Sequence, residues 1–176
     1  MSSDAPVPQT QPHGSLAPRR PRKVILDVDP GVSDALAVCL AVLSPELDVV
    51  AVTATGGNVD SHQASRNVEA IVAYLDPPHW PRLGAADDDQ PLRAHNAELW
   101  GDDGFCGAPV KHAELHNQHA STKVLAEEIR SASGEVTVIA GGPLSNLAAV
   151  FQIEPDLAMQ VGHLIIVGGT LDGPGD

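Results

Sequence analysis

The chain has 176 residues, of which 43% are hydrophobic, and it carries a net charge of −13 with 10 basic against 23 acidic residues. This length and hydrophobic content suit one folded domain with a core. The acidic balance disfavours nucleic acid and anionic membranes as partners, because both are bound by clustered Lys and Arg. With no apolar run of the roughly 20 residues that span a bilayer and no recognisable signal peptide, we expect a cytoplasmic protein.

The chain alternates between strand-like and helix-like patterns from residue 22 onward. Residues 1–21 are rich in Pro, Ser and Gln and predict a disordered tail. Strands are expected at 23–28, 47–55, 82–85, 135–140 and 163–167, and helices at 34–43, 61–75, 121–131, 144–151 and just after Pro155. The helix at 34–43 is apolar nearly all round, which predicts that it is buried. Residues 22–176 therefore predict an α/β domain, an open and mainly parallel sheet with helices on both faces.

The first turn of this domain is strongly acidic. Asp27, Asp29 and Asp34 surround a Pro-Gly turn between the first strand and the first helix. Acids this close repel one another unless a cation lies among them, and calcium accepts about six to eight oxygen ligands. The alternative is that Ser33 or Asp34 only caps the helix while the other carboxylates are solvated.

Polar groups also follow later strands and could reach the same edge of the sheet. Asn58 is either a turn residue after two glycines or a ligand contact. The turn at 141–146, with sequence GGPLSN, either starts a helix or also offers a backbone carbonyl to the ion. Trp100 lies in a long irregular stretch at 86–118 and is either a loop anchor or a surface on which a planar ligand stacks.

Together these motifs resemble the N-terminal half of the nucleoside hydrolases, the family of the inosine-uridine preferring enzymes. The family signature Asp-x-Asp-Pro-Gly-x-Asp-Asp-Ala stands here as DVDPGVSDA at 27–35. Further matches follow in the family order: SPELDVVAVTATGGNVD at 44–60, RLGA at 82–85, WGDDGFCG at 100–107, GGPLSNLA at 141–148 and HLIIVGG at 163–169.

The resemblance implies hydrolysis of the N-glycosidic bond of ribonucleosides to ribose and free base, with Ca2+ held at the strand ends. It implies that Asp29 is both a metal ligand and the base that takes a proton from the attacking water. Asp34 and the backbone carbonyl of Ser145 are implied as further ligands, and Asn58 as a sugar contact. Asp27, from its place in the acidic turn, is expected to join the metal ligands.

The chain also departs from the family pattern. Ser33 replaces an aspartate that is expected to grip ribose hydroxyls, so a weaker sugar contact is expected. Trp100 replaces a usual His, so base recognition is expected to rely on stacking. The family continues beyond the equivalent of Asp176, so the domain is expected to be incomplete at its C-terminus and to expose apolar surface on its last strand.

Three functional hypotheses therefore stay open. The chain is a piece of a complete hydrolase or works together with one, or it is a metal- or nucleoside-binding remnant without turnover. In the third hypothesis it is an α/β binding or assembly module whose acidic turn is only structural. A homo-oligomer is one option for its assembly.

Overall fold

The computed structural model describes residues 20–87, 100–110 and 118–172. Most of the predicted tail at 1–21 and much of the irregular stretch at 86–118 thus lie outside the described residues. The elements in chain order are β1 (Arg22–Val28), α1 (Val32–Leu43), β2 (Leu47–Ala54), α2 (Ser61–Leu75), β3 (Arg82–Ala85), β4 (His119–Ala120), α4 (Ser121–Ser131), β5 (Thr137–Ala140), α5 (Ser145–Ile153), the 3-10 helix η1 (Pro155–Gln160) and β6 (His163–Ile166). None of the described helices is long and apolar enough to cross a membrane.

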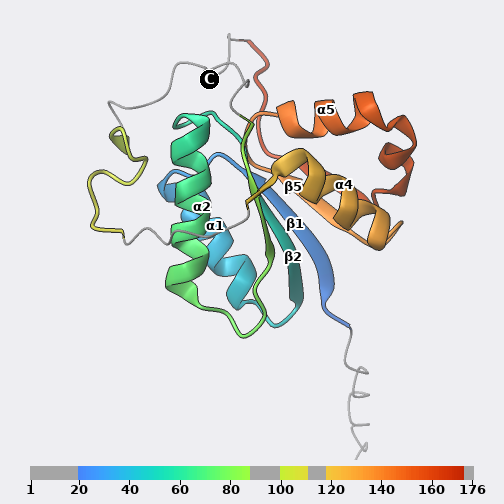
Figure 1. Cartoon of the computed structure of the whole chain (residues 1–176), viewed down its shortest axis with the longest axis horizontal. Helices are drawn as coiled ribbons and strands as arrows, with labels where there is room; N and C mark the ends of the chain where they lie inside the picture. Colours follow the sequence, from blue (N-terminus) through green and yellow to red (C-terminus); the bar gives the residue numbers. More distant parts are fainter. Residues whose placement is uncertain (1–19, 88–99, 111–117, 173–176) are drawn as a thin grey trace, which may run out of the picture.

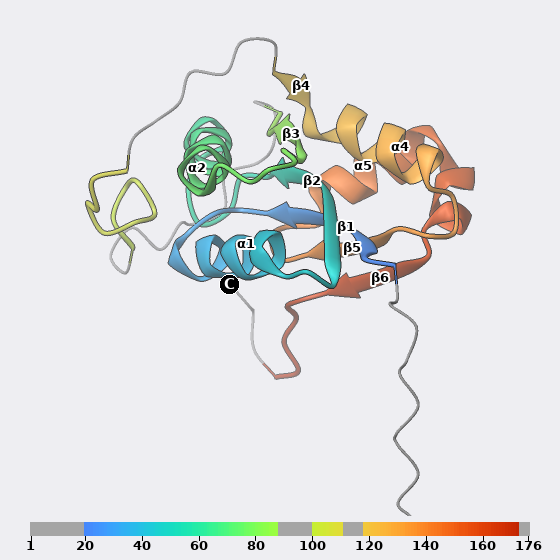
Figure 2. The same ribbon diagram turned by 90° about the horizontal axis from the view of Figure 1, so that it is seen from below.

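The six strands form one sheet in the order β4-β3-β2-β1-β5-β6, and every neighbouring pair is parallel. The chain runs outward from β1 to β4 and then returns to the other side of β1 for β5 and β6. Helices α1 and α2 cover one face of the sheet, while α4 and α5 cover the other (Figures 1 and 2). The predicted α/β class, with a mainly parallel sheet between two helical layers, is confirmed.

The side chains of β1 alternate between the two helical layers. Val24, Leu26 and Val28 belong to the apolar cluster under α1 and α2. Ile25 belongs to the second cluster, under α4 and α5. Because neighbouring strand residues point to opposite faces, Asp27 shares the face of Ile25 and is directed toward α5.

The expectation that the first helix is buried is wrong. In α1, Val38 and Ala41 are buried against the sheet, but Leu36, Leu40 and Leu43 are 61%, 73% and 69% exposed. The reason is that α1 has a single contact face: it packs on the sheet and α2, and no other described element covers its outer side. Apolar residues on all sides of a helix therefore do not predict that all its sides are covered.

The edge strand β6 carries a second exposed apolar surface. Leu164, Ile165 and Ile166 are all partly exposed although they pair with β5 on one side. The expected exposure of apolar side chains on the last strand is confirmed.

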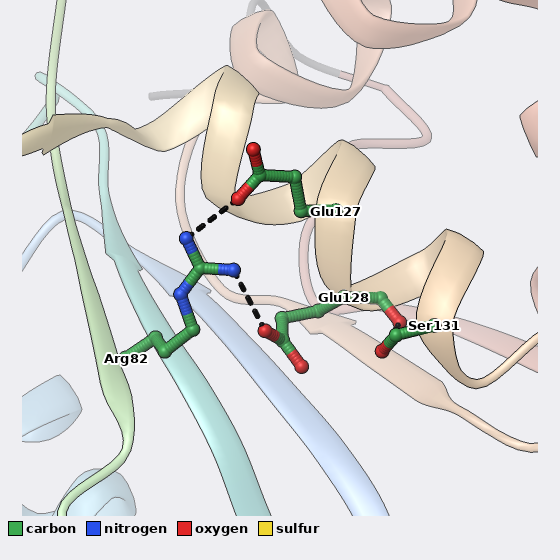
Figure 3. Close-up of polar contacts among 4 residues, drawn as sticks. All are labelled: Arg82, Glu127, Glu128 and Ser131. Carbon is green, nitrogen blue, oxygen red and sulfur yellow. Dashed lines mark hydrogen bonds and ion pairs between the residues drawn. The ribbon is translucent and has the colours of Figure 1, made fainter.

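Arg82 forms two ion pairs that join strand β3 to helix α4. Arg82 at the start of β3 reaches Glu127 Oε2 at 2.7 Å and Glu128 Oε1 at 2.9 Å through its two terminal nitrogens (Figure 3). Within α4, the Ser131 hydroxyl donates to the carbonyl oxygen of Glu128 at 3.0 Å. Since solvent screens these partly exposed charges, the two ion pairs contribute little to stability and mainly set the orientation of α4.

Candidate active site

The candidate site lies where the strand order reverses. The chain leaves β1 toward β2 on one side, and β5 lies on the other side of β1. Backbone bonds extend the sheet at this end: the Thr55 N–H donates to the Val28 carbonyl at 2.9 Å, and the Gly141 N–H donates to the Asp27 carbonyl at 2.8 Å. Ligands of open α/β sheets bind outside the carboxyl ends of the strands at such a reversal.

Asp29 is held between the loop after β2 and the turn after β5. Its side chain is buried, and Oδ2 accepts a hydrogen bond from the Asn58 N–H at 2.8 Å. The Asn58 side chain also donates from Nδ2 to the Asp29 carbonyl at 3.1 Å. Asn58 thus donates hydrogen bonds to both the backbone and the carboxylate of Asp29. Its contact with the sugar stays a prediction.

Asp29 and Asp34 form a carboxyl pair. They share a side-chain hydrogen bond, and the Gly31 N–H donates to Asp34 at the start of α1. Burial, with the nearby Asp34 charge as a smaller contribution, raises the pKa of Asp29 to about 7, and burial also raises the pKa of Asp34. Asp34 thus accepts a hydrogen bond from the N-cap residue of α1. The alternative in which an acid only caps this helix while the other carboxylates are solvated is wrong, because Asp27 and Asp29 are buried.

Asp27 is fully buried one residue before the end of β1. Its Oδ1 accepts hydrogen bonds from Thr53 Oγ1 at 2.7 Å and from Asn146 Nδ2 at 2.8 Å, while its Oδ2 has no hydrogen-bond partner among the described residues. Burial raises the pKa of Asp27 to about 6 against the opposing effect of these two bonds. One carboxylate oxygen thus ties β1 to β2 and α5, and the other is left available.

Glycines line the two paired carboxyl groups. A Cβ atom at Gly57 would overlap Asp29 Oδ2 and lie 2.9 Å from Pro143 Cδ. A Cβ atom at Gly142 would lie 3.0 Å from Asp29 Oδ1, and one at Gly141 would lie 3.2 Å from Asp34 Oδ1. The absence of side chains at these positions keeps the space beside both carboxyl groups free of Cβ atoms.

These residues fit a hard cation only in part. In residues 20–87, 100–110 and 118–172, no three His, Cys, Asp or Glu side chains are grouped as a metal site. The donors that are present are nevertheless of the right kind, because Asp29, Asp34 and the unpartnered Asp27 Oδ2 are all carboxylate oxygens. Ser145 opens α5 at the same end of the sheet, where its hydroxyl lies 3.0 Å from that of Thr55, and its role as a carbonyl ligand stays a prediction.

The loop that contains Trp100 lies beside the acidic turn. The Cys106 N–H donates to the Trp100 carbonyl at 2.6 Å, and the Phe105 side chain is buried in the core under α1 and α2. A Cβ atom at Gly104, which has a φ of 77°, would lie 3.0 Å from the carbonyl oxygen of Pro30. The structure therefore brings this loop to the turn, with Trp100 itself half-buried.

The predicted site residues fall into two groups. A connected group contains Asp27, Asp29, Asp34, Asn58 and Ser145, which come from three neighbouring strand ends. Ser33 is exposed on the first turn of α1, next to Asp34, and Trp100 is half-buried in the loop whose Gly104 approaches Pro30. Thr53 and Asn146 were missed as partners of Asp27; the signal for Asn146 was its place directly after Ser145 in the GGPLSN turn.

Comparison with known proteins identifies the family. The family model of the inosine-uridine preferring nucleoside hydrolases matches residues 24–176. The chain belongs to this family. The resemblance drawn from its sequence motifs is thereby confirmed.

Curated relatives and solved structures agree with this assignment. The chain is 32% identical over 157 residues to probable uridine nucleosidase 2 of Arabidopsis thaliana, a match that covers 85% of this chain and 48% of that protein. It is 32% identical over 150 residues to the pyrimidine-specific ribonucleoside hydrolase RihA of Salmonella paratyphi A, covering 84% of this chain and 48% of that one. A purine-preferring ribonucleoside hydrolase from Gardnerella vaginalis superposes with a TM-score of 0.77 at 25% identity, over 86% of this chain and 50% of its own. The chain thus spans about half the length of the curated relatives that it matches.

Proposed function

We propose that this chain carries the catalytic carboxylates of a calcium-dependent ribonucleoside hydrolase, which cleaves the N-glycosidic bond to give ribose and a free base. The pair formed by the buried Asp29 and the half-buried Asp34 at the strand reversal is the observation that carries this proposal. None of the ion pairs formed among the described residues includes either of them. A buried acid and a half-buried acid that share a hydrogen bond, with no ion pair to a cationic side chain, favour a bound cation.

Four residues would hold the ion. Asp29, Asp34 and the Ser145 carbonyl are the proposed ligands, with the available oxygen of Asp27 as a further donor. Bound there, calcium would supply positive charge that lowers the pKa of a water molecule and orients the ribose hydroxyls.

Asp29 is the proposed general base. The Asn58 N–H fixes its Oδ2, and the carboxylate takes a proton from the attacking water. The water oxygen bonds to C1′ of the ribose while the bond from C1′ to the base breaks and its electron pair leaves with the base. The neighbouring negative charges stabilise the oxocarbenium-like transition state of glycoside cleavage.

Substrate contacts are proposed for the residues at the border of the site. Ser33 and Asn58 would contact ribose hydroxyls, and Trp100 would stack on the base. Such an activity in the cytoplasm would serve the salvage of purines and pyrimidines.

A second candidate function is binding of calcium or nucleoside without turnover. The observation that favours it is the partial donor set, since the described residues contain no complete metal group. This candidate uses the same residues, so the same variants test it.

Ribose release from inosine and uridine, measured with the chain and added calcium, separates the candidates. We expect release by the unmodified chain, loss of release in Asp29→Ala, and no loss in Asp48→Ala, a matched control whose side chain is exposed on β2. No release together with calcium-dependent thermal stabilisation would support the binding function. Neither release nor stabilisation would contradict both functions and leave the acidic turn with a structural role.

A further inference from the structure

Asn67 is a fully buried amide in the middle of α2, and it contacts two segments outside its own helix. Its Nδ2 donates to the Pro30 carbonyl at 2.9 Å and to the Asp103 carbonyl at 2.8 Å. Its Oδ1 accepts a hydrogen bond from Gln63 Nε2 at 2.8 Å. Both amide hydrogens are therefore committed to carbonyl groups outside α2.

Each of these carbonyl groups belongs to a part of the proposed site. Pro30 lies between Asp29 and Gly31, the N-cap of α1, so its carbonyl belongs to the acidic turn. Asp103 lies in the same loop as Trp100. A single NH2 group thus links the backbone of the acidic turn to the backbone of the Trp100 loop.

The loop is shaped to reach this junction. Asp103 Oδ1 accepts hydrogen bonds from the Phe105 N–H at 2.9 Å and from the Gly107 N–H at 3.2 Å, so the loop has its own internal framework. A Cβ atom at Gly104 would lie 3.0 Å from the Pro30 oxygen and 3.2 Å from Asn67 Nδ2. Only glycine combines this close approach with the left-handed backbone at this position.

We propose that Asn67 is a positioning residue that sets the Trp100 loop against the acidic turn, so that the groups for the base and for the ribose form one site. The proposal rests on the proposed function for the meaning of that site, but the junction itself is a property of this chain. Asn67 touches neither a proposed metal ligand's side chain nor any proposed substrate contact, and it acts through the two carbonyl groups.

Trp100 provides a direct readout of the junction. The sequence has two tryptophans, and in a Trp80→Phe background the fluorescence reports on Trp100 alone. In Asn67→Ala we expect about a twofold rise in acrylamide quenching of Trp100, because losing a buried hydrogen-bond donor frees the loop. We also expect calcium affinity to fall about tenfold, as is typical when a partner that orients a metal ligand is lost.

Ser65→Ala is the matched control. Ser65 is also buried in α2, and its hydroxyl donates within the helix to the Ser61 carbonyl and accepts from the Ala86 N–H, away from the acidic turn. We expect Ser65→Ala to lower the melting temperature without changing Trp100 quenching or calcium affinity. Equal thermal losses in the two variants, with Trp100 quenching unchanged in Asn67→Ala, would overturn the proposal and leave Asn67 as a core residue only.

Gly104→Ala tests the same junction from the loop and keeps the test valid if Asn67→Ala does not fold. Its Cβ would press on Pro30 and Asn67, so we expect Trp100 quenching to rise as in Asn67→Ala; unchanged quenching would contradict the proposal. If the unmodified chain binds no calcium, the proposed function fails, whereas the Trp100 measurement still decides the role of Asn67.

Discussion

One region of the molecule buries acidic side chains, whereas another exposes large apolar side chains to solvent. We call the first the acidic rim (Asp27, Asp29, Asp34, Asn58 and Asn146) and the second the apolar edge (Leu36, Leu40, Leu43, Leu164, Ile165 and Ile166). The acidic rim takes carboxyl groups out of water and surrounds them with hydrogen-bond donors and glycines. The apolar edge leaves large apolar side chains of α1 and β6 in contact with solvent.

The difference separates residues that the fold of this chain packs inside from residues that it leaves outside. Burial of a carboxylate is costly unless bonds or a counter-charge compensate, and the bonds of the acidic rim offset only part of that cost, because Asp27 Oδ2 has no partner among the described residues. Exposed apolar patches of this kind mark contact surfaces. Substitutions should therefore affect folding strongly at the acidic rim and weakly at the apolar edge.

The largest effect on folding is expected for Asn146→Ala. Asn146 Nδ2 donates to Asp27 Oδ1 at 2.8 Å and to the Ala54 carbonyl at 2.9 Å, and both acceptors are buried. Thr53 and Ser121 still donate to these two acceptors, but loss of both Asn146 bonds, one of them to a carboxylate, should lower the free energy of unfolding by about 3 kcal/mol, measured by urea denaturation. Gln152→Ala, an exposed amide on the same helix, should change it by less than about 0.5 kcal/mol. A loss below about 1 kcal/mol in Asn146→Ala would show that the bonds at Asp27 are not needed for folding.

An intermediate effect is expected inside α1, where two neighbouring positions belong to opposite environments. Val38 is fully buried and Leu40 is 73% exposed. Val38→Ala should lower the free energy of unfolding by about 2 kcal/mol through loss of packing, whereas Leu40→Ala should stay within about 0.5 kcal/mol. If Leu40→Ala lowers the free energy of unfolding as much as Val38→Ala does, and the loss depends on protein concentration, the apolar edge is covered by a second molecule in solution.

A further effect should appear as pH dependence in calcium-free buffer. Burial raises the pKa of Asp27 to about 6 and that of Asp29 to about 7, from 3.8. Because the folded state then binds more protons than the unfolded state, the stability from these groups is present at acid pH and is lost as pH rises from about 4 to 7. The melting temperature should therefore fall by several degrees between pH 5 and pH 8, less so in Asp29→Asn, and calcium should remove the fall. A melting temperature that rises over this interval without calcium would contradict buried, uncompensated carboxyl groups.

The architecture was accessible from the sequence because its strands and helices carry regular apolar patterns. The β-branched run at 47–55 and the stripe of 61–75 predicted β2 and α2 closely. Helix α1 begins at Val32, two residues before the expected start, because Gly31 is its N-cap and the Asp34 side chain accepts the Gly31 N–H. Such capping bonds depend on local geometry that an apolar pattern does not encode.

The polar contacts of the site were less accessible. Asp27 and Asp29 were singled out from their spacing, but the bonds from Asn146 and Asn58 join strand ends that only the sheet order brings together. Asn67 had a detectable signal, since it lies three residues after Ala64 and beside Val68 on the buried stripe of α2. A polar residue on a buried stripe requires partners, but the sequence does not tell which carbonyl groups supply them.

Calcium titration calorimetry of the unmodified chain tests the central claim most directly. We expect one calcium ion to bind per chain, affinity to fall at least about tenfold in Asp34→Asn, and Asp48→Asn to behave like the unmodified chain. The same heat of binding in Asp34→Asn and the unmodified chain, or no binding heat at millimolar calcium, would contradict a cation site at the acidic rim.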